Sequence, residues 1–177
     1  MQPEARTSLL SRLLGPRADD HAAVRPLWHA LVGTAREKAW YADLGVADTL
    51  PGRFDAITLV LSLALLRMEH EEPLKGPSVL LTELFVTDMD GQLRETGVGD
   101  MVVGKHIGRL MSVLGGRLGA YRSALQEGDD TALAQALARN MTMIEGADTA
   151  GLAAAVRALF QRLESKPASA LLAGEIE

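Results

Sequence analysis

Three residues near the middle of the chain have the types and spacing of a phosphate-hydrolysing site. Asp88, Asp90 and Gly91 form an Asp-x-Asp-Gly tetrad. In haloacid dehalogenase-like phosphohydrolases, the first aspartate of such a tetrad attacks phosphorus, and the second handles the leaving-group proton beside one magnesium ion. That chemistry requires a buried strand that ends at the first aspartate. The tetrad therefore makes a magnesium-dependent phosphohydrolase one alternative for the function.

The residues around the tetrad fit that chemistry poorly. Residues 80–86 could form one short strand, but the sequence after them predicts helices rather than alternating strands and helices. Gln92 stands where the phosphohydrolase pattern has threonine. A calcium-binding EF-hand fits less well, because a loop that starts at Asp88 would have Leu93 at its glycine position and Gly99 at its glutamate position. The four histidines share no metal-ligand spacing, so we expect no metal, no cofactor and no catalytic residue.

Ordinary helix chemistry explains much of the same segment. Asp90 and Arg94 are four residues apart in the order that favours a helical ion pair. Gly97 can end one helix in a left-handed conformation, and Asp100 can cap the next helix. These roles leave a dense group of charges unexplained. The charged or ionisable residues that crowd this corner are Asp88, Arg94, Glu95, Lys105 and His106.

Apolar residues recur at intervals of three and four over most of the chain, which predicts an all-α fold. We expect one helix from Val24 to about Ala42, and a central helix over about 51–69 that is apolar on most sides. Another helix should start near Pro77. Three apolar stripes predict the later helices: Val103 to Leu125, Leu133 to Ile144, and Leu152 to Leu163. With a short closing helix, the chain should form a single-domain bundle of about six to eight helices around the central one.

Composition fits one domain and excludes several functions. The chain has 177 residues, of which 47% are hydrophobic and 23% charged, enough for a core that folds unaided. A net charge of -5 argues against nucleic-acid binding, which requires a basic face. The absence of cysteine excludes disulfides and thiolate catalysis. We expect residues 21–177 to form the helical domain.

The first 20 residues should form an amphipathic or flexible segment. Four leucines at positions 9, 10, 13 and 14 stand among arginines at positions 6, 12 and 17, a pattern that could make a weak contact with a membrane surface. The longest apolar run, residues 56–66, is too short to cross a bilayer. We therefore expect a cytoplasmic protein whose contact with the inner membrane is at most peripheral.

Several motifs along the chain resemble one known family. They are Tyr41, Gly52-Arg53-Phe54-Asp55, Leu84-Phe85, Asp88-Met89-Asp90, Leu93-Arg94-Glu95, Gly97-Val98-Gly99-Asp100 and Lys105. In this order and at this spacing they resemble the ubiquinol-cytochrome c chaperones, the cytochrome b assembly factors of mitochondria and their bacterial relatives, over residues 27–125. The resemblance implies an all-helical bacterial protein that is not an enzyme. It would bind newly made cytochrome b and support assembly of the cytochrome bc complex, with a ribosome or a small helical protein as a further partner.

The same motifs supply the candidate residues for client binding or for a structural network. They are Tyr41, Arg53, Asp55, Asp88, Asp90, Arg94, Glu95, Asp100 and Lys105. Our hypothesis is that Arg53 and Asp55 face the charges of the 88–100 corner across a cleft with an apolar lining. Adaptable methionines could supply that lining: Met68, Met89, Met101 and Met111.

Three alternatives stay open at this point. The charges could form an ion-pair network that only stabilises the fold, or the chain could be a helical adaptor with an unrelated client. Trp40 and Tyr41 could anchor the core or form an exposed binding patch.

Overall fold

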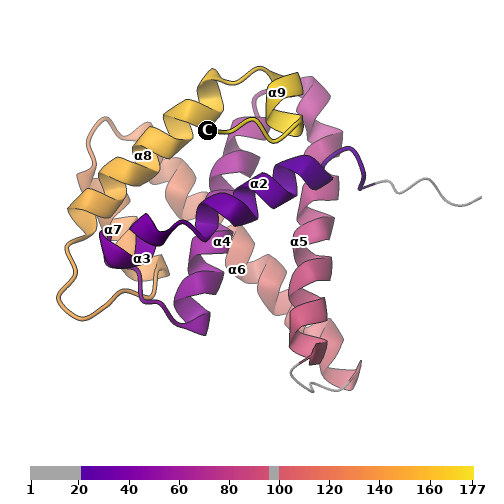
Figure 1. Cartoon of the computed structure of the whole chain (residues 1–177), viewed down its shortest axis with the longest axis horizontal. Coiled ribbons are helices and arrows are strands. Elements are labelled where there is room, and N and C mark those ends of the chain that lie inside the picture. Colours follow the sequence, from indigo (N-terminus) through magenta and orange to yellow (C-terminus); the bar gives the residue numbers. More distant parts are fainter. Residues whose placement is uncertain (1–20, 96–99) are drawn as a thin grey trace, which may run out of the picture.

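The protein is an all-α bundle built around one central helix (Figure 1). The structure, a computed structural model, describes residues 21–95 and 100–177, and for 93–95, 100–104 and 106 it describes the backbone alone. In chain order the helices are α2 (Arg25–Ala35), α3 (Lys38–Ala42), α4 (Leu50–Met68), the 3₁₀ turn η1 (Glu72–Leu74), α5 (Lys75–Glu95), α6 (Asp100–Gln126), α7 (Thr131–Asn140), α8 (Thr149–Ser165) and α9 (Ala168–Leu172). Within these residues the backbone forms no strand beyond an isolated bridge between Val46 and Met143. The predicted all-α fold is confirmed, whereas the predicted segment 1–20 lies outside the described residues.

Helix α4 forms the core of the bundle, as the apolar sequence over 51–69 predicts. Thr49 caps its first turn by accepting a hydrogen bond from the Gly52 amide at 3.3 Å. The helix packs against α2, α5, α6 and α8, so side chains on all of its sides are buried. Two buried hydroxyls inside it, those of Thr58 and Ser62, donate to carbonyl oxygens one turn earlier. A helix that is apolar all round therefore lies where neighbours can cover every face.

The prediction of one helix from Val24 to Ala42 is wrong, because the helix is interrupted at Arg36 and Glu37. Helix α2 ends at Ala35, Glu37 has a non-helical conformation with ψ 134°, and α3 starts at Lys38. The Trp40 indole nitrogen donates to the Thr34 carbonyl at 2.7 Å, and the Tyr41 hydroxyl donates to the Ala35 carbonyl at 2.7 Å. These side chains thus bond to two of the last carbonyls of α2, and the Thr34 carbonyl also accepts from the Glu37 amide at 3.1 Å. Trp40 is therefore a core anchor and Tyr41 a partly buried one, rather than an exposed patch.

The predicted helix over Leu133 to Ile144 is also too long. Helix α7 ends at Asn140, and Met141 is extended. The chain from there pairs with the loop before α4, since the Ala47 amide donates to the Thr142 carbonyl and the Ile144 amide donates to the Gly45 carbonyl, both at 2.9 Å. This pairing leaves Ile144 52% exposed instead of in the core. The two connected loops set the position of the first turn of α4.

A buried arginine joins the ends of α4 and α8. The Arg67 side chain donates to the carbonyls of Leu163 and Lys166 at 3.2 and 3.0 Å, and to the Glu71 carboxylate at 2.7 Å. The last carbonyls of a helix have no partner within that helix, so a guanidinium can satisfy them. Arg67 therefore connects the carboxyl end of α8 to the central helix by hydrogen bonds.

We expect Arg67→Met to lower the free energy of unfolding by about 2–4 kcal/mol, because it removes the guanidinium that bonds to the Leu163 and Lys166 carbonyls and leaves Glu71 without its partner. Urea denaturation followed by circular dichroism measures the change. The matched control is Arg122→Met, which removes the exposed pair with Glu69 and should cost less than about 1 kcal/mol. Equal losses in the two variants would contradict the capping role of Arg67.

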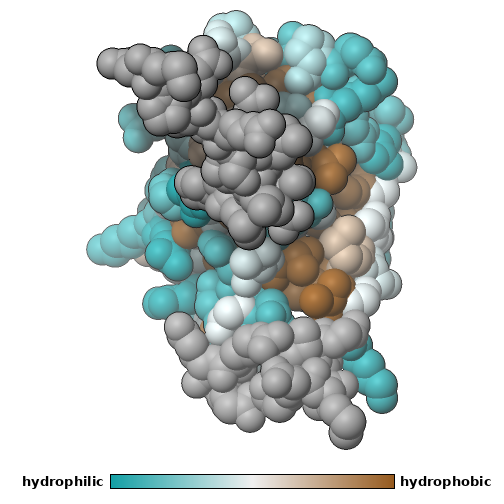
Figure 2. Space-filling view, turned by 90° about the vertical axis from the view of Figure 1, so that its right-hand side faces the viewer, coloured by the Kyte–Doolittle hydropathy of each residue, from teal (hydrophilic) through white to brown (hydrophobic). Residues whose placement is uncertain are grey.

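Apolar side chains also reach the surface on the α5 side of the molecule. Figure 2 shows that side, where hydrophobic residues gather between hydrophilic margins. On α5, Val79 is 58% exposed, while Leu80 and Val86 are partly buried against the core. Exposed apolar surface of this kind is available to a partner. Over the part of the chain that the structure describes, no helix is both long enough and apolar enough to cross a membrane.

Candidate functional site

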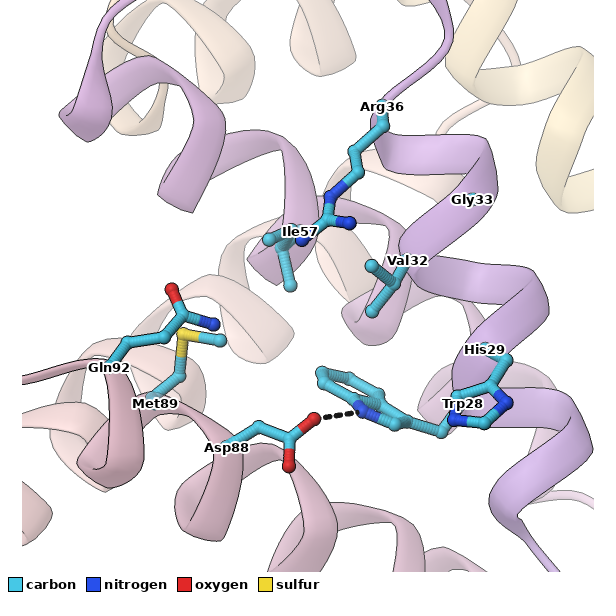
Figure 3. A pocket seen from close by; sticks show the side chains of 9 residues that line it. All are labelled: Trp28, His29, Val32, Gly33, Arg36, Ile57, Asp88, Met89 and Gln92. Carbon is cyan, nitrogen blue, oxygen red and sulfur yellow. Dashed lines mark hydrogen bonds between the residues drawn. The ribbon is translucent and has the colours of Figure 1, made fainter. Parts of the chain in front are cut away.

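A pocket of about 380 Å³ opens between α2, α4 and α5 (Figure 3). Its lining combines apolar side chains with charged and amide groups. The lining residues are Trp28, His29, Val32, Gly33, Arg36, Ile57, Asp88, Met89 and Gln92. The apolar members form the floor, and His29, Arg36, Asp88 and Gln92 supply polar groups at the surface. We call this space the α2–α5 pocket.

Helical spacing brings the lining residues onto facing sides of two helices. Residues at intervals of three and four share one side of a helix, as Trp28 and Val32 do near the start and middle of α2. Asp88 and Gln92 have the same relation on α5. Since α2 packs against α5 and both contact α4, their polar edges meet over Ile57 of the central helix. Periodicity predicts each helical face, but it cannot predict which faces meet.

Asp88 and Trp28 hold the two helices together at the pocket. The Trp28 indole nitrogen donates to the Asp88 carboxylate oxygen Oδ2 at 2.5 Å. The Trp28 ring also packs edge-on against Phe85, with ring centroids 6.2 Å apart. Trp28 is 2% exposed, so its orientation is fixed by packing as well as by the hydrogen bond. A carboxylate has more acceptor positions than one indole proton fills, so Asp88 retains the capacity to bind a donor that enters the pocket.

The position of Asp88 removes the geometric basis for the phosphohydrolase alternative. Asp88 and Asp90 lie within α5, and the residues before them are helical. Residues two apart on a helix point in different directions, so their carboxylates do not converge on one ion as they would beyond a strand end. The strand-end arrangement that the Asp-x-Asp-Gly chemistry needs is therefore absent from this segment.

Asp55 belongs to a second, separate network on the other side of α4. Its oxygen Oδ1 accepts from the Arg117 guanidinium on α6 at 2.5 Å. Its oxygen Oδ2 accepts from the Thr142 amide at 2.8 Å and from the Thr142 hydroxyl at 2.6 Å. The Arg117 guanidinium also lies 5.7 Å from the centre of the Phe54 ring. Asp55 therefore joins α4, α6 and the segment after α7.

The sequence interpretation missed Arg117 and Thr142. One signal for Arg117 was present, because it lies three residues after Leu114 and four before Tyr121, on the buried stripe of α6. A charged residue at such a position needs a buried partner. Nothing in the sequence identifies Thr142, which donates to Asp55 because the chain after α7 is extended.

Arg53 and Tyr41 lie near each other but take part in neither network. Arg53 is exposed and donates to Asp48 at 2.7 Å, and this hydrogen bond lowers the pKa of Asp48 and raises the pKa of Arg53. Burial raises the pKa of the Tyr41 phenol, and the nearby positive charge of Arg53 opposes that rise. Arg53 thus connects α4 to the loop before it, whereas Tyr41 bonds to the end of α2. The structure does not bring Arg53, Asp55 and Asp88 into a common network as the cleft hypothesis supposes.

The remaining candidates lie along the α5 and α6 segments. Asp90 is a partly buried residue of α5, and Lys105 is an exposed residue of α6. The side chains of Arg94, Glu95 and Asp100 lie outside the described residues, as does the predicted helix stop at Gly97. Their ion-pairing and capping roles stay predictions.

The four methionines do not line one groove. Met89 lines the α2–α5 pocket, and Met111 is exposed on α6. Met68 is fully buried in the core, so its predicted place in a client groove is wrong. Its position near the end of α4, which neighbours cover on every side, explains the burial. The side chain of Met101 lies outside the described residues.

Comparisons with known proteins agree with the helical architecture. A family model described as ubiquinol-cytochrome C chaperone matches residues 42–177, a range that includes Asp55 and Asp88 but not Trp28. Among solved structures, the crystal structure of the Cbp3 homolog from Brucella abortus is similar, with 37% sequence identity and a TM-score of 0.78. The match covers 89% of this chain and 89% of that one. No curated protein matches the chain.

Proposed function

The chain belongs to the ubiquinol-cytochrome c chaperone family, and we propose that it binds newly made cytochrome b through the α2–α5 pocket. Membership makes it an assembly chaperone of the cytochrome bc complex and points to a non-enzymatic protein. The identity of the client and the place where it binds are the proposed part. Because cytochrome b is a membrane protein, the chaperone would meet it in the cytoplasm, at the surface of the inner membrane.

The mixed lining of the α2–α5 pocket supports this proposal. A membrane protein with several spans exposes apolar helices and charged loops before its cofactors and partner subunits arrive. A site for such a client needs an apolar floor that excludes water and a polar rim that orients charged groups. Val32, Ile57 and Met89 provide the floor, while Arg36 and Asp88 carry opposite charges at the rim. Arginine, methionine and tryptophan are also residue types enriched at protein interfaces.

The shape of the pocket is partly fixed before a client arrives. Trp28 is held by a hydrogen bond to Asp88 and by the edge-on contact with the Phe85 ring, so little of its side-chain freedom remains to be lost on binding. Met89 can still adjust, because its side chain is unbranched. A site that combines the fixed Trp28 ring with the adjustable Met89 side chain can bind client segments that differ in shape.

We expect Arg36→Glu to reduce the capture of cytochrome b about tenfold, because it reverses the charge at the rim and truncation of interface anchors costs 1 kcal/mol or more. The protein is tagged in its native host, crosslinked briefly and purified, and captured cytochrome b is quantified by mass spectrometry. Arg36 is exposed, so circular dichroism and the melting curve should not change.

The matched control is Arg162→Glu, the same charge reversal at an exposed position on α8. It should leave capture at the original level. A second variant, Val32→Ser, tests the apolar floor and should also weaken capture. If Arg36→Glu and Arg162→Glu capture equal amounts of cytochrome b, the α2–α5 pocket is not the client site.

The same capture tests the other proposed partners. Ribosomal proteins, or one small helical protein, should be enriched together with cytochrome b if the chaperone receives its client during synthesis. Enrichment of cytochrome b alone would restrict the proposal to the client. If cytochrome b is absent from every sample, the family membership and the role in assembly of the cytochrome bc complex remain, but the proposed client is wrong. The chain would then be a helical adaptor with another client.

A further inference from the structure

A second pocket, of about 430 Å³, lies where α4 and α6 meet the end of α7. Its lining is mostly polar and shares no residue with the α2–α5 pocket. The lining residues are Asp55, Ser112, Val113, Gly116, Arg117, Arg139, Asn140, Met141 and Thr142. We call it the α6–α7 pocket, and its volume is within the range of small-molecule sites.

The charges that line the α6–α7 pocket sum to a positive value. It contains two guanidinium groups, those of Arg117 and Arg139, and one carboxylate, that of Asp55. The Asp55 oxygens accept three hydrogen bonds from Arg117 and Thr142. The negative charge of Asp55 therefore balances the positive charge of Arg117. Arg139 is exposed at the end of α7, and its charge is left to attract an anion into the pocket.

Arg117 has one terminal nitrogen whose N–H groups no described residue accepts. Its nitrogen Nη2 donates to Asp55, but Nη1 is buried and lacks a hydrogen-bond partner within the described residues. A buried donor without an acceptor is unfavourable, and a guanidinium is never deprotonated to relieve the cost. An oxyanion in the pocket would compensate the positive charge of this guanidinium, whose nitrogen Nη1 itself has no surface open to solvent.

The Arg117 guanidinium is held in position before any ligand arrives. Asp55 fixes one edge of it, and the Phe54 ring lies beside it at 5.7 Å. A planar guanidinium fixed in this way binds carboxylate or phosphate oxygens with little further loss of freedom. Ser112 adds a hydroxyl to the lining, and Gly116 adds no side chain that would fill the space. We propose that the α6–α7 pocket is an oxyanion site that binds a ligand carrying a carboxylate or a phosphate group.

The test measures anion binding by the full chain with two probes, inorganic phosphate and acetate. Each is titrated as its sodium salt against sodium chloride at equal ionic strength, and backbone amide signals are followed by heteronuclear NMR. We expect saturating shifts at Gly116, Asn140 and Thr142 with at least one probe. Stronger binding of phosphate would identify a phosphate ligand, and stronger binding of acetate would identify a carboxylate ligand; either result supports the site.

Two exposed arginines provide the matched variants. Arg139→Gln should weaken the binding at least fivefold without unfolding the protein, because Arg139 is exposed. Arg162→Gln, on α8 and outside the pocket, should bind like the original chain. Shifts that do not saturate, that spread over many basic residues, or that persist equally in both variants would overturn the proposal. This test involves no client, so its failure leaves the cytochrome b proposal untouched, and failure of the client capture leaves the oxyanion site untouched.

Discussion

The Asp55→Ala protein is expected to lose about 3–5 kcal/mol of unfolding free energy, because removal of one partner leaves a buried charge uncompensated. The side chains of Asp55 and Arg117 are 9% and 11% exposed. Without the carboxylate, neither terminal nitrogen of Arg117 has an acceptor among the described residues, and the Thr142 amide and hydroxyl lose theirs. Urea denaturation of both proteins measures the difference.

A double-variant cycle separates this network from a simple loss of packing. The variant Asp55→Leu with Arg117→Met replaces the pair by apolar side chains of similar size, which is often far less harmful than breaking the pair. We expect it to be more stable than Asp55→Leu alone. As a surface control, Asp48→Ala breaks the exposed pair with Arg53 and should change stability little. If the double variant were as unstable as the sum of its single variants, the ion pair would not be the source of the effect.

Gly52→Ala should destabilise the protein by about 3 kcal/mol, the upper end of the range for substitutions that overpack a site and force the backbone to move. An added Cβ at position 52 would lie 1.9 Å from the carbonyl oxygen of Ala47. That carbonyl belongs to the loop that pairs with residues 142–144, so neither the loop nor the first turn of α4 can shift alone. Thermal and urea unfolding of the variant measure the loss.

Gly115→Ala is the matched control for that substitution. Gly115 lies within α6, and an added Cβ there meets no atom within 4 Å. Alanine is favoured over glycine in a helix interior by about 0.5–1 kcal/mol, so this variant should be slightly more stable than the original chain. Equal destabilisation by both substitutions would show that the contact with Ala47 is not the cause.

These results would explain the motif Gly52-Arg53-Phe54-Asp55 by structural roles. Gly52 allows the close approach of the Ala47 carbonyl, and Arg53 pairs with Asp48. Phe54 lies beside the Phe85 ring and the Arg117 guanidinium, and Asp55 binds Arg117 and Thr142. The motif therefore fixes the start of the central helix. Within the family motifs, Asp88 and Met89 lie at the pocket where we place the client.

Asp55 and Asp88 also show why an ion-pair network and a client site need different tests. Asp55 is buried and its partners are partly buried, so its substitution should change stability first. Asp88 is at the surface of α5, where it orients Trp28 beside an open pocket. A substitution at the rim of that pocket can therefore change binding while the fold persists.

The sequence by itself determined the all-α class, the central helix and the family. Periodicity is local, because residues three and four apart lie on one side of a helix wherever that helix is placed. The apolar character of residues 51–68 is equally local, and it predicts a helix that neighbours cover on all sides. The ordered motifs predicted the family that the comparisons confirm.

The tertiary structure alone decided where the helices stop and what the charged residues bind. Trp40 and Tyr41 lie within the single helix that the sequence predicts over 24–42, yet their polar atoms bond to the last carbonyls of α2, and that helix ends at Ala35. Asp88 meets a partner 60 residues away, and Asp55 meets partners 62 and 87 residues away. Those pairings depend on how the helices pack, and side-chain spacing along one helix contains no information about which neighbour it will face.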